Sequence, residues 1–172
     1  MSPGGQPLAD FGTRLLAYLI DTAIMTVVAV VFFVPALLIF VFTQVADLEP
    51  TYDGTGMVEP DLGDFFVPLL LLQLGLVLLL LVASYLYHVE MMYRSGQTVG
   101  KKAMKIRVVR ADPSTPTLTR GMAAKRYLVE SVAGLLLPFF SYVDGLWQLW
   151  DEPYQQTLHD KVAKTVVIKV AP

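Results

Sequence analysis

The sequence predicts an α-helical integral membrane protein with two transmembrane helices, a third apolar segment that is broken, and a small pair of β-strands. Two runs without a charged residue, 22–46 and 65–87, support this prediction. Each is long enough, at about 1.5 Å per residue, to cross a bilayer core of about 30 Å. The chain is 55% hydrophobic and only 16% charged, whereas a soluble domain carries about 25% charge. Because the missing charge is confined to these runs, it indicates membrane spans.

Residues 1–172 are expected to form a single membrane domain with no room for a separate soluble catalytic domain. The chain contains no cysteine, which excludes disulfides, thiolate metal sites and cysteine catalysis. No set of nucleophile, base and orienting residue is visible, so we expect neither an enzyme nor a metal or organic cofactor. The first apolar run is longer than the core of a signal peptide and is expected to remain as the first span.

Charge along the chain predicts the topology. The first span is expected over residues 15–42 and the second over residues 65–89. The loop between them, 43–64, contains six acidic residues, no basic residue, and the Pro and Gly content of an irregular loop. Residues 90–126 contain nine of the thirteen Lys and Arg residues and two acidic ones. The positive-inside rule therefore places residues 90–126 and the N-terminus in the cytoplasm and the acidic loop outside.

The basic segment is expected to contact anionic lipid headgroups rather than nucleic acid. Residues 96–101 read GQTVGK and superficially resemble a phosphate-binding loop. They have three residues between the glycines instead of four, and Lys102 stands where Ser or Thr is required. We therefore expect a tight turn that leads into a strand.

The third apolar segment, 127–150, is long enough to span but contains two acids, two glycines and Pro138. Proline removes a helical hydrogen bond, which neighbouring groups must replace in lipid. One interpretation is a single kinked span that leaves the C-terminal tail outside. The other is a pair of half-helices that re-enters and returns the tail to the cytoplasm.

Two short segments rich in β-branched residues bear on this choice. Residues 105–110 read KIRVVR and residues 165–170 read TVVIKV, which is typical of short strands. If they pair, both lie on the same face of the membrane, and the third segment must turn back. The pairing therefore favours a cytoplasmic tail.

Arg14, Tyr18 and Asp21 lie at spacings i, i+4 and i+7 and share one face of the first helix. Placing a carboxylate within a membrane span costs roughly 3 kcal/mol on insertion scales. Such a carboxylate therefore usually faces the protein interior and pairs with another polar or charged group. Three interpretations stay open for Asp21. It can belong to a structural ion-pair network, bind a proton or cation, or lie at the interface in contact with headgroup water.

Glu130 and Asp144 are the secondary candidate site residues. Glu130 is expected to form an i, i+4 ion pair with Arg126, and Asp144 is expected to cap the second half of the broken helix or to belong to a functional site. The two histidines, His88 and His159, lack metal-binding spacing and are expected to be interfacial or hydrogen-bonded.

Three motifs in order resemble the RDD family of small bacterial membrane proteins, over nearly the whole chain. They are residues 11–21 (FGTRLLAYLID), residues 96–102 (GQTVGKK) followed by 106–109 (IRVV), and residues 156–167 (QTLHDKVAKTVV). Lys164 stands where that family commonly has glycine. The resemblance implies that Arg14, Asp21 and Asp160 form one network, and that the tail is cytoplasmic if Asp160 approaches Arg14 there.

Transport, including cation/proton antiport, has been suggested for members of that family, and fold analogy alone does not carry it over. One hypothesis is transport of a small cation or solute, with Asp21 titrating and Arg14 tuning its pKa. Because two or three spans barely enclose a pathway, the transport hypothesis requires a homo-oligomer. The alternative is a non-transporting accessory or scaffold protein that binds lipid or a membrane partner. The expected location is the bacterial cytoplasmic membrane.

Overall fold

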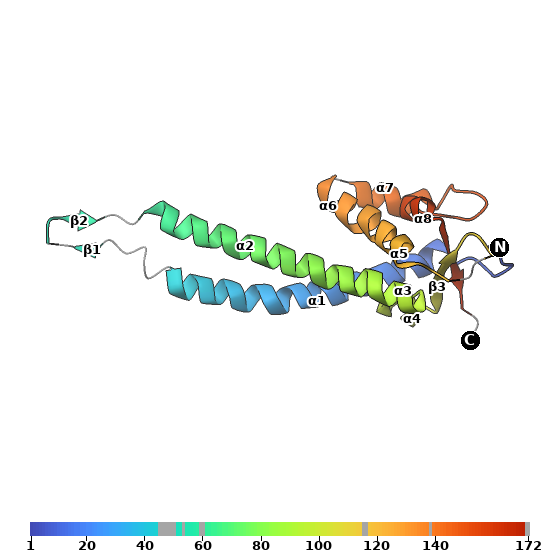
Figure 1. Ribbon diagram of the computed structural model, residues 1–172, viewed down its shortest axis with the longest axis horizontal. Helices are drawn as coiled ribbons and strands as arrows, with labels where there is room; N and C mark the ends of the chain where they lie inside the picture. The colour runs from blue at the N-terminus through green and yellow to red at the C-terminus, as the bar shows by residue number, and fades with distance from the viewer. Residues whose placement is uncertain (45–50, 53, 59–60, 115–116, 138, 171–172) are drawn as a thin grey trace. The chain divides into compact units, whose positions relative to one another are not determined.

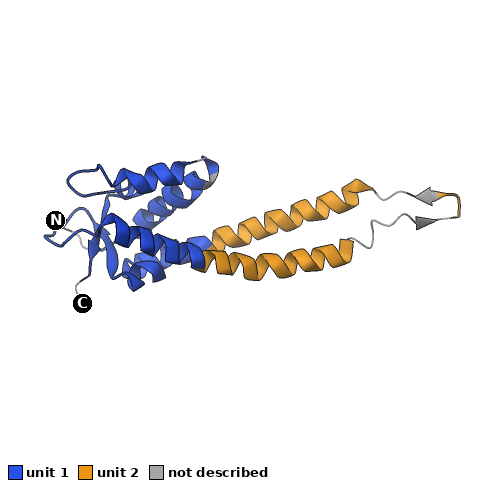
Figure 2. Ribbon diagram, turned by 180° about the vertical axis from the view of Figure 1, so that it is seen from behind, with its two compact units in different colours: residues 1–23, 84–172 blue, residues 24–83 orange. Residues whose placement is uncertain are grey.

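The computed structural model describes residues 1–172 except 45–50, 53, 59–60, 115–116, 138 and 171–172. The described chain is mostly helical (Figure 1). It divides into two compact units, which Figure 2 shows in different colours. One unit combines Met1–Ala23 with Ser84–Pro172, and the other is Ile24–Ala83. Segments from both ends of the chain therefore fold together in the first unit.

Two long apolar helices confirm the two predicted hydrophobic segments, with wider bounds. Helix α1 is Phe11–Gln44, and α2 is Leu62–Tyr85. Helix α2 continues through a π-helical turn, η2 (Leu86–Glu90), into α3 (Met91–Ser95).

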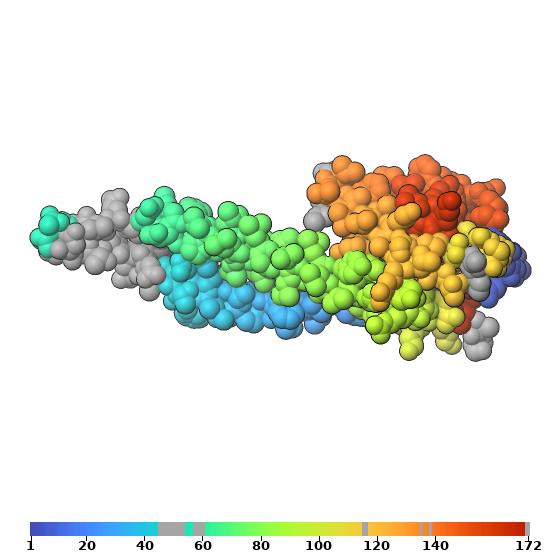
Figure 3. All heavy atoms as spheres, in the orientation of Figure 1, coloured from blue at the N-terminus to red at the C-terminus, as the bar shows by residue number. Residues whose placement is uncertain are grey.

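Within the unit Ile24–Ala83, α1 and α2 run antiparallel, and the rings of Phe40 and Phe65 meet at a centroid distance of 5.4 Å. Large apolar side chains such as Val27, Ile39 and Leu78 are exposed on the outside of these helices, which form the cyan and green surface in Figure 3. Such a surface is what a helix facing lipid requires.

The loop between the two helices contains a little regular structure where an irregular loop was expected. Strand β1 (Thr51–Tyr52) pairs antiparallel with β2 (Met57–Val58). Several acidic positions of the loop, including Asp47 and Glu59, lie outside the described residues.

A second antiparallel pair confirms the strands predicted at residues 105–110 and 165–170. Strand β3 (Ile106–Arg110) pairs with β4 (Thr165–Lys169), in a register that runs from Ile106 opposite Lys169 to Arg110 opposite Thr165. Leu8 adds a single bridge to Ile168, so the N-terminal segment also joins this sheet. The start of the chain, its basic segment and its tail therefore lie in one unit.

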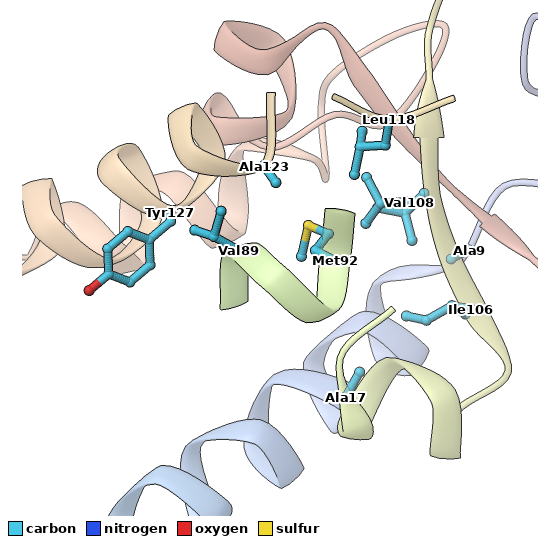
Figure 4. Close-up of a cluster of buried hydrophobic side chains, with 10 residues drawn as sticks. Ala9, Ala17, Val89, Met92, Ile106, Val108, Leu118, Ala123 and Tyr127 are labelled. Atoms are coloured by element: carbon cyan, nitrogen blue, oxygen red, sulfur yellow. The ribbon is translucent and has the colours of Figure 1, made fainter. Parts of the chain in front are cut away.

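The hydrophobic core of this unit gathers side chains from α1, η2, α3, the sheet, and α5 (Arg120–Tyr127). Figure 4 shows Met92 between Val89 and Val108, with Leu118 and Ala123 close by. Burial of such side chains removes apolar area from water at about 25 cal/mol per Å². This packing gives the short two-stranded sheet the support that an isolated pair lacks.

The segment 96–105 begins with the expected tight turn, but a short helix separates this turn from the strand. Gly96 has φ 70°, and a Cβ there would lie 2.7 Å from the carbonyl oxygen of Val108, so glycine is required for the turn. Helix α4 (Val99–Ala103) follows. It forms because the Thr98 side chain accepts a hydrogen bond from the backbone N–H of Lys101 at 3.4 Å.

The third apolar segment is broken, as predicted, and it folds back on itself. It consists of η3 (Leu128–Ala133), α6 (Gly134–Leu136) and α7 (Phe140–Trp147). Helix α7 packs against η3, so the two arms form a hairpin (Figure 1). A Cβ on Gly134 would lie 2.4 Å from Ser141 Oγ, which shows how close the arms come. Pro138, the expected cause of the break, lies outside the described residues.

Helix α8 (Leu158–Ala163) connects this hairpin to β4. It begins at a capping box, in which Thr157 and Asp160 each accept a hydrogen bond from the other's backbone N–H. It ends at Lys164, which has φ 54° and ψ 49°. A left-handed residue at this position explains why glycine is common there in the family that the sequence resembles.

Candidate functional site

Asp21 is buried, and each of its carboxylate oxygens has two partners. Oδ1 accepts hydrogen bonds from the Tyr87 hydroxyl at 2.6 Å and from the Gly100 backbone N–H at 2.8 Å. Oδ2 accepts from the Thr98 hydroxyl at 2.5 Å and lies 3.7 Å from the Lys101 ammonium. The residue is 3% exposed. Asp21 therefore connects the segment around residue 100 to the first turns of α1.

Gly100 makes this contact sterically possible. A Cβ on Gly100 would lie 2.2 Å from the Ala17 carbonyl oxygen and 2.8 Å from Asp21 Oδ1. Real Cβ atoms do not approach a backbone oxygen this closely, so α4 can reach α1 only with glycine at this position.

Asp160 is the centre of a second buried cluster. Its Oδ2 accepts from Arg14 Nη1 at 3.1 Å and from the Thr157 backbone N–H at 3.4 Å. Its Oδ1 accepts from Arg126 Nη1 and, at 3.1 Å, from the Thr165 hydroxyl. Arg14 also donates to the carbonyl oxygens of residues 9 and 167. The cluster therefore joins α1, α5, α8 and β4.

The protonation of Asp160 reflects this environment. Burial by itself raises the pKa of a carboxyl group. Here the charges of Arg126, His159 and Arg14 outweigh it and hold the pKa of Asp160 well below its usual range. Asp160 is therefore ionised at neutral pH.

The expected ion pair between Glu130 and Arg126 is replaced by other contacts. Arg126 turns to Asp160, and the Glu130 Oε2 atom lies 3.9 Å from His159 Nε2. The reason is burial, because a fully buried guanidinium is stabilised more by a hydrogen-bonded carboxylate in the core than by a partner on its own helix.

The expectation that Asp144 caps the second half-helix was also wrong. Asp144 lies inside α7, whose N-cap position is Phe139. Its Oδ1 accepts from the His159 backbone N–H at 2.9 Å, and its Oδ2 lies 2.6 Å from His159 Nδ1. A chain of titratable groups, Asp144–His159–Glu130, thus crosses from α7 through α8 to η3.

A cavity of about 590 Å³ lies beside this chain, within the unit Met1–Ala23 and Ser84–Pro172. Its charged lining residues are Arg14, Lys101, Arg126, Glu130, Asp144 and Asp160, with His159. Apolar and aromatic side chains such as Leu15, Phe139 and Tyr142 line the rest. Among the described residues, no three His, Asp or Glu side chains are arranged to hold a metal ion.

The residues that the sequence grouped together occupy two clusters. Arg14 reaches Asp160, whereas Asp21 binds the segment around Gly100. Tyr18 is 48% exposed and lines the cavity.

The partners of Asp21 were not expected from the sequence; they are Tyr87, Thr98 and Lys101. Nor was Arg126 expected to pair with Asp160. Thr98 and Lys101 lie in the central motif, so the motif was a usable signal for them. The sequence around Tyr87 and Arg126 carries no such signal, because their partners are 66 and 34 residues away.

The fold is that of a helical protein in which two helices, Phe11–Gln44 and Leu62–Ser95, are long and apolar enough to cross a membrane. The family model of the RDD family matches residues 8–164, so the chain belongs to the RDD family. Comparisons with curated proteins and with solved structures gave no match. The family and the two apolar helices together indicate a membrane protein.

Proposed function

We propose that this RDD protein exchanges a small cation for protons across the bacterial cytoplasmic membrane. The observation that carries the proposal is the cavity beside Asp144, His159 and Glu130. A histidine is the side chain whose charge changes most readily near neutral pH. Ionisable groups within a membrane protein that face its interior or a water-filled cavity are candidates for an ion pathway or a proton relay.

The proposed orientation follows the charge distribution. Residues 90–126 and the N-terminus face the cytoplasm and contact anionic headgroups, and the loop 43–64 faces the outside. The hairpin of η3, α6 and α7 then returns the tail to the cytoplasmic side, where β4 joins β3. A re-entrant hairpin of this kind is tolerated in a membrane where protein or a water-filled cavity surrounds it.

The proposed functional unit is a homo-oligomer. Two long helices expose most of their apolar surface within the chain, and two spans barely enclose a pathway. Copies of the chain packed side by side supply the missing walls. A strictly monomeric protein in the bilayer contradicts the exchange proposal.

Proton movement in proteoliposomes tests the proposal. Purified protein is reconstituted with a pH dye inside, and Na⁺, K⁺ or Li⁺ is added outside against a choline control. Exchange predicts cation-dependent movement of protons above that of empty liposomes. No movement with any of the three cations contradicts it.

A folded Asp21→Asn variant belongs in the same experiment. Each of the two carboxylate oxygens of Asp21 already has two protein partners. We therefore expect the free energy of unfolding to fall by about 3 kcal/mol, while the flux per folded protein stays unchanged. Asp112→Asn is the control, because Asp112 is exposed and should leave both quantities unchanged. Loss of flux in a variant of intact stability would instead place Asp21 on the pathway.

The second candidate function is a non-transporting accessory or scaffold protein that binds lipid or a membrane partner. The saturation of Asp21 and Asp160 by protein donors favours it, because both aspartates then serve the fold. This candidate predicts no proton movement and a copurifying partner or a defined lipid requirement.

A further inference from the structure

We infer that a second cavity, which three arginines line, binds a phosphate group carried by a soluble compound or by a lipid headgroup. The cavity has a volume of about 760 Å³, and all its lining residues belong to the unit Met1–Ala23 and Ser84–Pro172. It shares no lining residue with the cavity beside Glu130. The inference therefore goes beyond the proposed exchange of cations and does not depend on it.

Contacts at the free edge of β3 bring the arginines of α3 and β3 together. Helix α3 ends before Gly96, whose carbonyl oxygen accepts a hydrogen bond from the Val108 N–H at 2.8 Å. The end of α3 therefore lies beside β3. A Cβ on Gly96 would lie 2.8 Å from Arg107 Cγ, so the Arg107 side chain passes directly over the glycine. Arg94 consequently lines the same cavity as Arg107 and Arg110.

Two of these arginines lack an anionic partner. The Nε atom of Arg110 is buried and has no hydrogen-bond acceptor in the described part of the chain. Arg107 is exposed, and its side chain forms no ion pair with the described residues. Arg94 lies 3.7 Å from Glu90, which Arg120 approaches more closely, at 3.1 Å. Because a buried donor without a partner is costly, an anion in the cavity would stabilise the Arg110 guanidinium.

The charges that line the cavity match a phosphate monoester. Three arginines stand against one carboxylate, Asp112. Hydrogen bonds from Ser114 hold the pKa of Asp112 below its usual value, with a smaller contribution from the charge of Arg110. The lining is therefore net positive at neutral pH. A phosphate monoester carries a charge of about −1.5 to −2 at pH 7, and the guanidinium fork fits two of its oxygens at once.

The size and the remaining lining favour an organic phosphate. A volume of about 760 Å³ lies in the range of small-molecule sites, about 300–1,000 Å³. Val108, Leu118 and Ile168 supply a buried apolar part, and Figure 4 shows the first two close together. Ser2 and Thr117 add hydroxyl groups to the lining. The cavity thus offers contacts to the substituent of a phosphate ester as well as to its phosphate.

Calorimetric titration of the purified full chain in a neutral detergent tests the site. Inorganic phosphate, glycerol phosphate and short-chain phosphatidic acid are added separately at constant ionic strength. We expect saturable binding of at least one of them, with one site per chain. Binding of glycerol phosphate identifies a soluble source of the phosphate, and binding of phosphatidic acid alone identifies a lipid headgroup. Short-chain phosphatidylglycerol, a phosphodiester with a single charge, should bind at least about tenfold more weakly than phosphatidic acid.

Substitutions in the lining separate the site from general surface charge. Arg107→Gln and Arg110→Gln should each weaken binding by about tenfold, because each removes a charge-assisted hydrogen bond. Asp112→Asn should strengthen binding several-fold, because it removes the opposing charge. Lys125→Gln is the matched control and should keep the wild-type affinity. It removes the same charge from an exposed position of α5 that does not line the cavity.

Three results would overturn the site. They are no saturable binding of any of the three phosphates, wild-type affinity in folded Arg107→Gln, and equal affinity for phosphatidylglycerol and phosphatidic acid. If Arg110→Gln does not fold, Arg107→Gln and Asp112→Asn still decide the question, because both residues are exposed. Proton movement in proteoliposomes bears on cation exchange alone, so the two proposals can fail independently.

Discussion

Asp160 is the residue at which charges from three helices converge. Arg14 of α1 and Arg126 of α5 donate to its two oxygens, and the capping box of α8 contributes the Thr157 N–H. Removing one partner of such a buried pair leaves an uncompensated charge, at a cost of about 3–5 kcal/mol. Asp160 therefore holds together segments that lie far apart in sequence.

This environment predicts an acid dependence of stability. In the folded state, the charges of Arg126, His159 and Arg14 outweigh burial and lower the pKa of Asp160. In the unfolded chain this pKa is about 3.9. Its stabilisation is therefore complete above about pH 5 and is lost as the pH falls through the folded pKa. Thermal unfolding in detergent between pH 7 and pH 3 should show a midpoint that falls steeply below about pH 4.

Asp160→Asn is the comparison for this pH series. The variant should be less stable at pH 7 and should lose part of the acid dependence, because the titrating carboxylate is gone. An unchanged slope in Asp160→Asn would assign the acid dependence to other carboxylates.

At the scale of elements, the short helices of the first unit are defined by their ends. Thr98 and Thr157 cap the N-termini of α4 and α8. Lys164 ends α8 in the left-handed conformation, which costs roughly 1 kcal/mol for a residue with a Cβ. The left-handed Lys164 allows β4 to start directly at Thr165, whose hydroxyl donates to Asp160.

Lys164→Gly should therefore stabilise the protein. Glycine adopts the left-handed conformation without strain, and the Lys164 side chain is exposed, so we expect a gain of about 1 kcal/mol in the free energy of unfolding. Lys102→Gly is the matched control, since Lys102 is also exposed but lies inside α4. That variant should lose about 1 kcal/mol. Chemical denaturation in detergent distinguishes the two, and a loss of stability in Lys164→Gly would contradict the strain argument.

At the scale of the whole molecule, both ends of the chain join one unit. The N-terminal segment, β3 and β4 share a sheet, and the hairpin of η3, α6 and α7 turns the chain back towards it. Because the two ends of the chain meet in one sheet, the arrangement fits the proposed returning third segment better than a single kinked span.

Single cysteines test this topology, because the natural chain has none. A membrane-impermeant maleimide applied to intact cells should label Thr55→Cys, in the loop 43–64. Ser114→Cys and Lys164→Cys should react only after the membrane is permeabilised. Labelling of Lys164→Cys in intact cells, with Ser114→Cys protected, would contradict the returning hairpin.

The sequence alone determined the helical class, the two apolar helices, the strand pair and the break in the third segment. These features depend on local composition and period, which hydropathy and β-branched runs report directly. The pairing of Arg14 with Asp160 was also accessible, through the family resemblance.

Only the tertiary structure decided how the buried charges are partitioned. Arg14 and Asp21 share a helix face, but seven residues separate them by about 10 Å along the axis, so each meets a different part of the fold. Arg126 pairs with Asp160 and not with Glu130. Asp144 contacts His159 instead of capping a helix. A buried charge is stabilised by whichever partner the packing brings within hydrogen-bonding distance, and spacing along the chain does not contain that information.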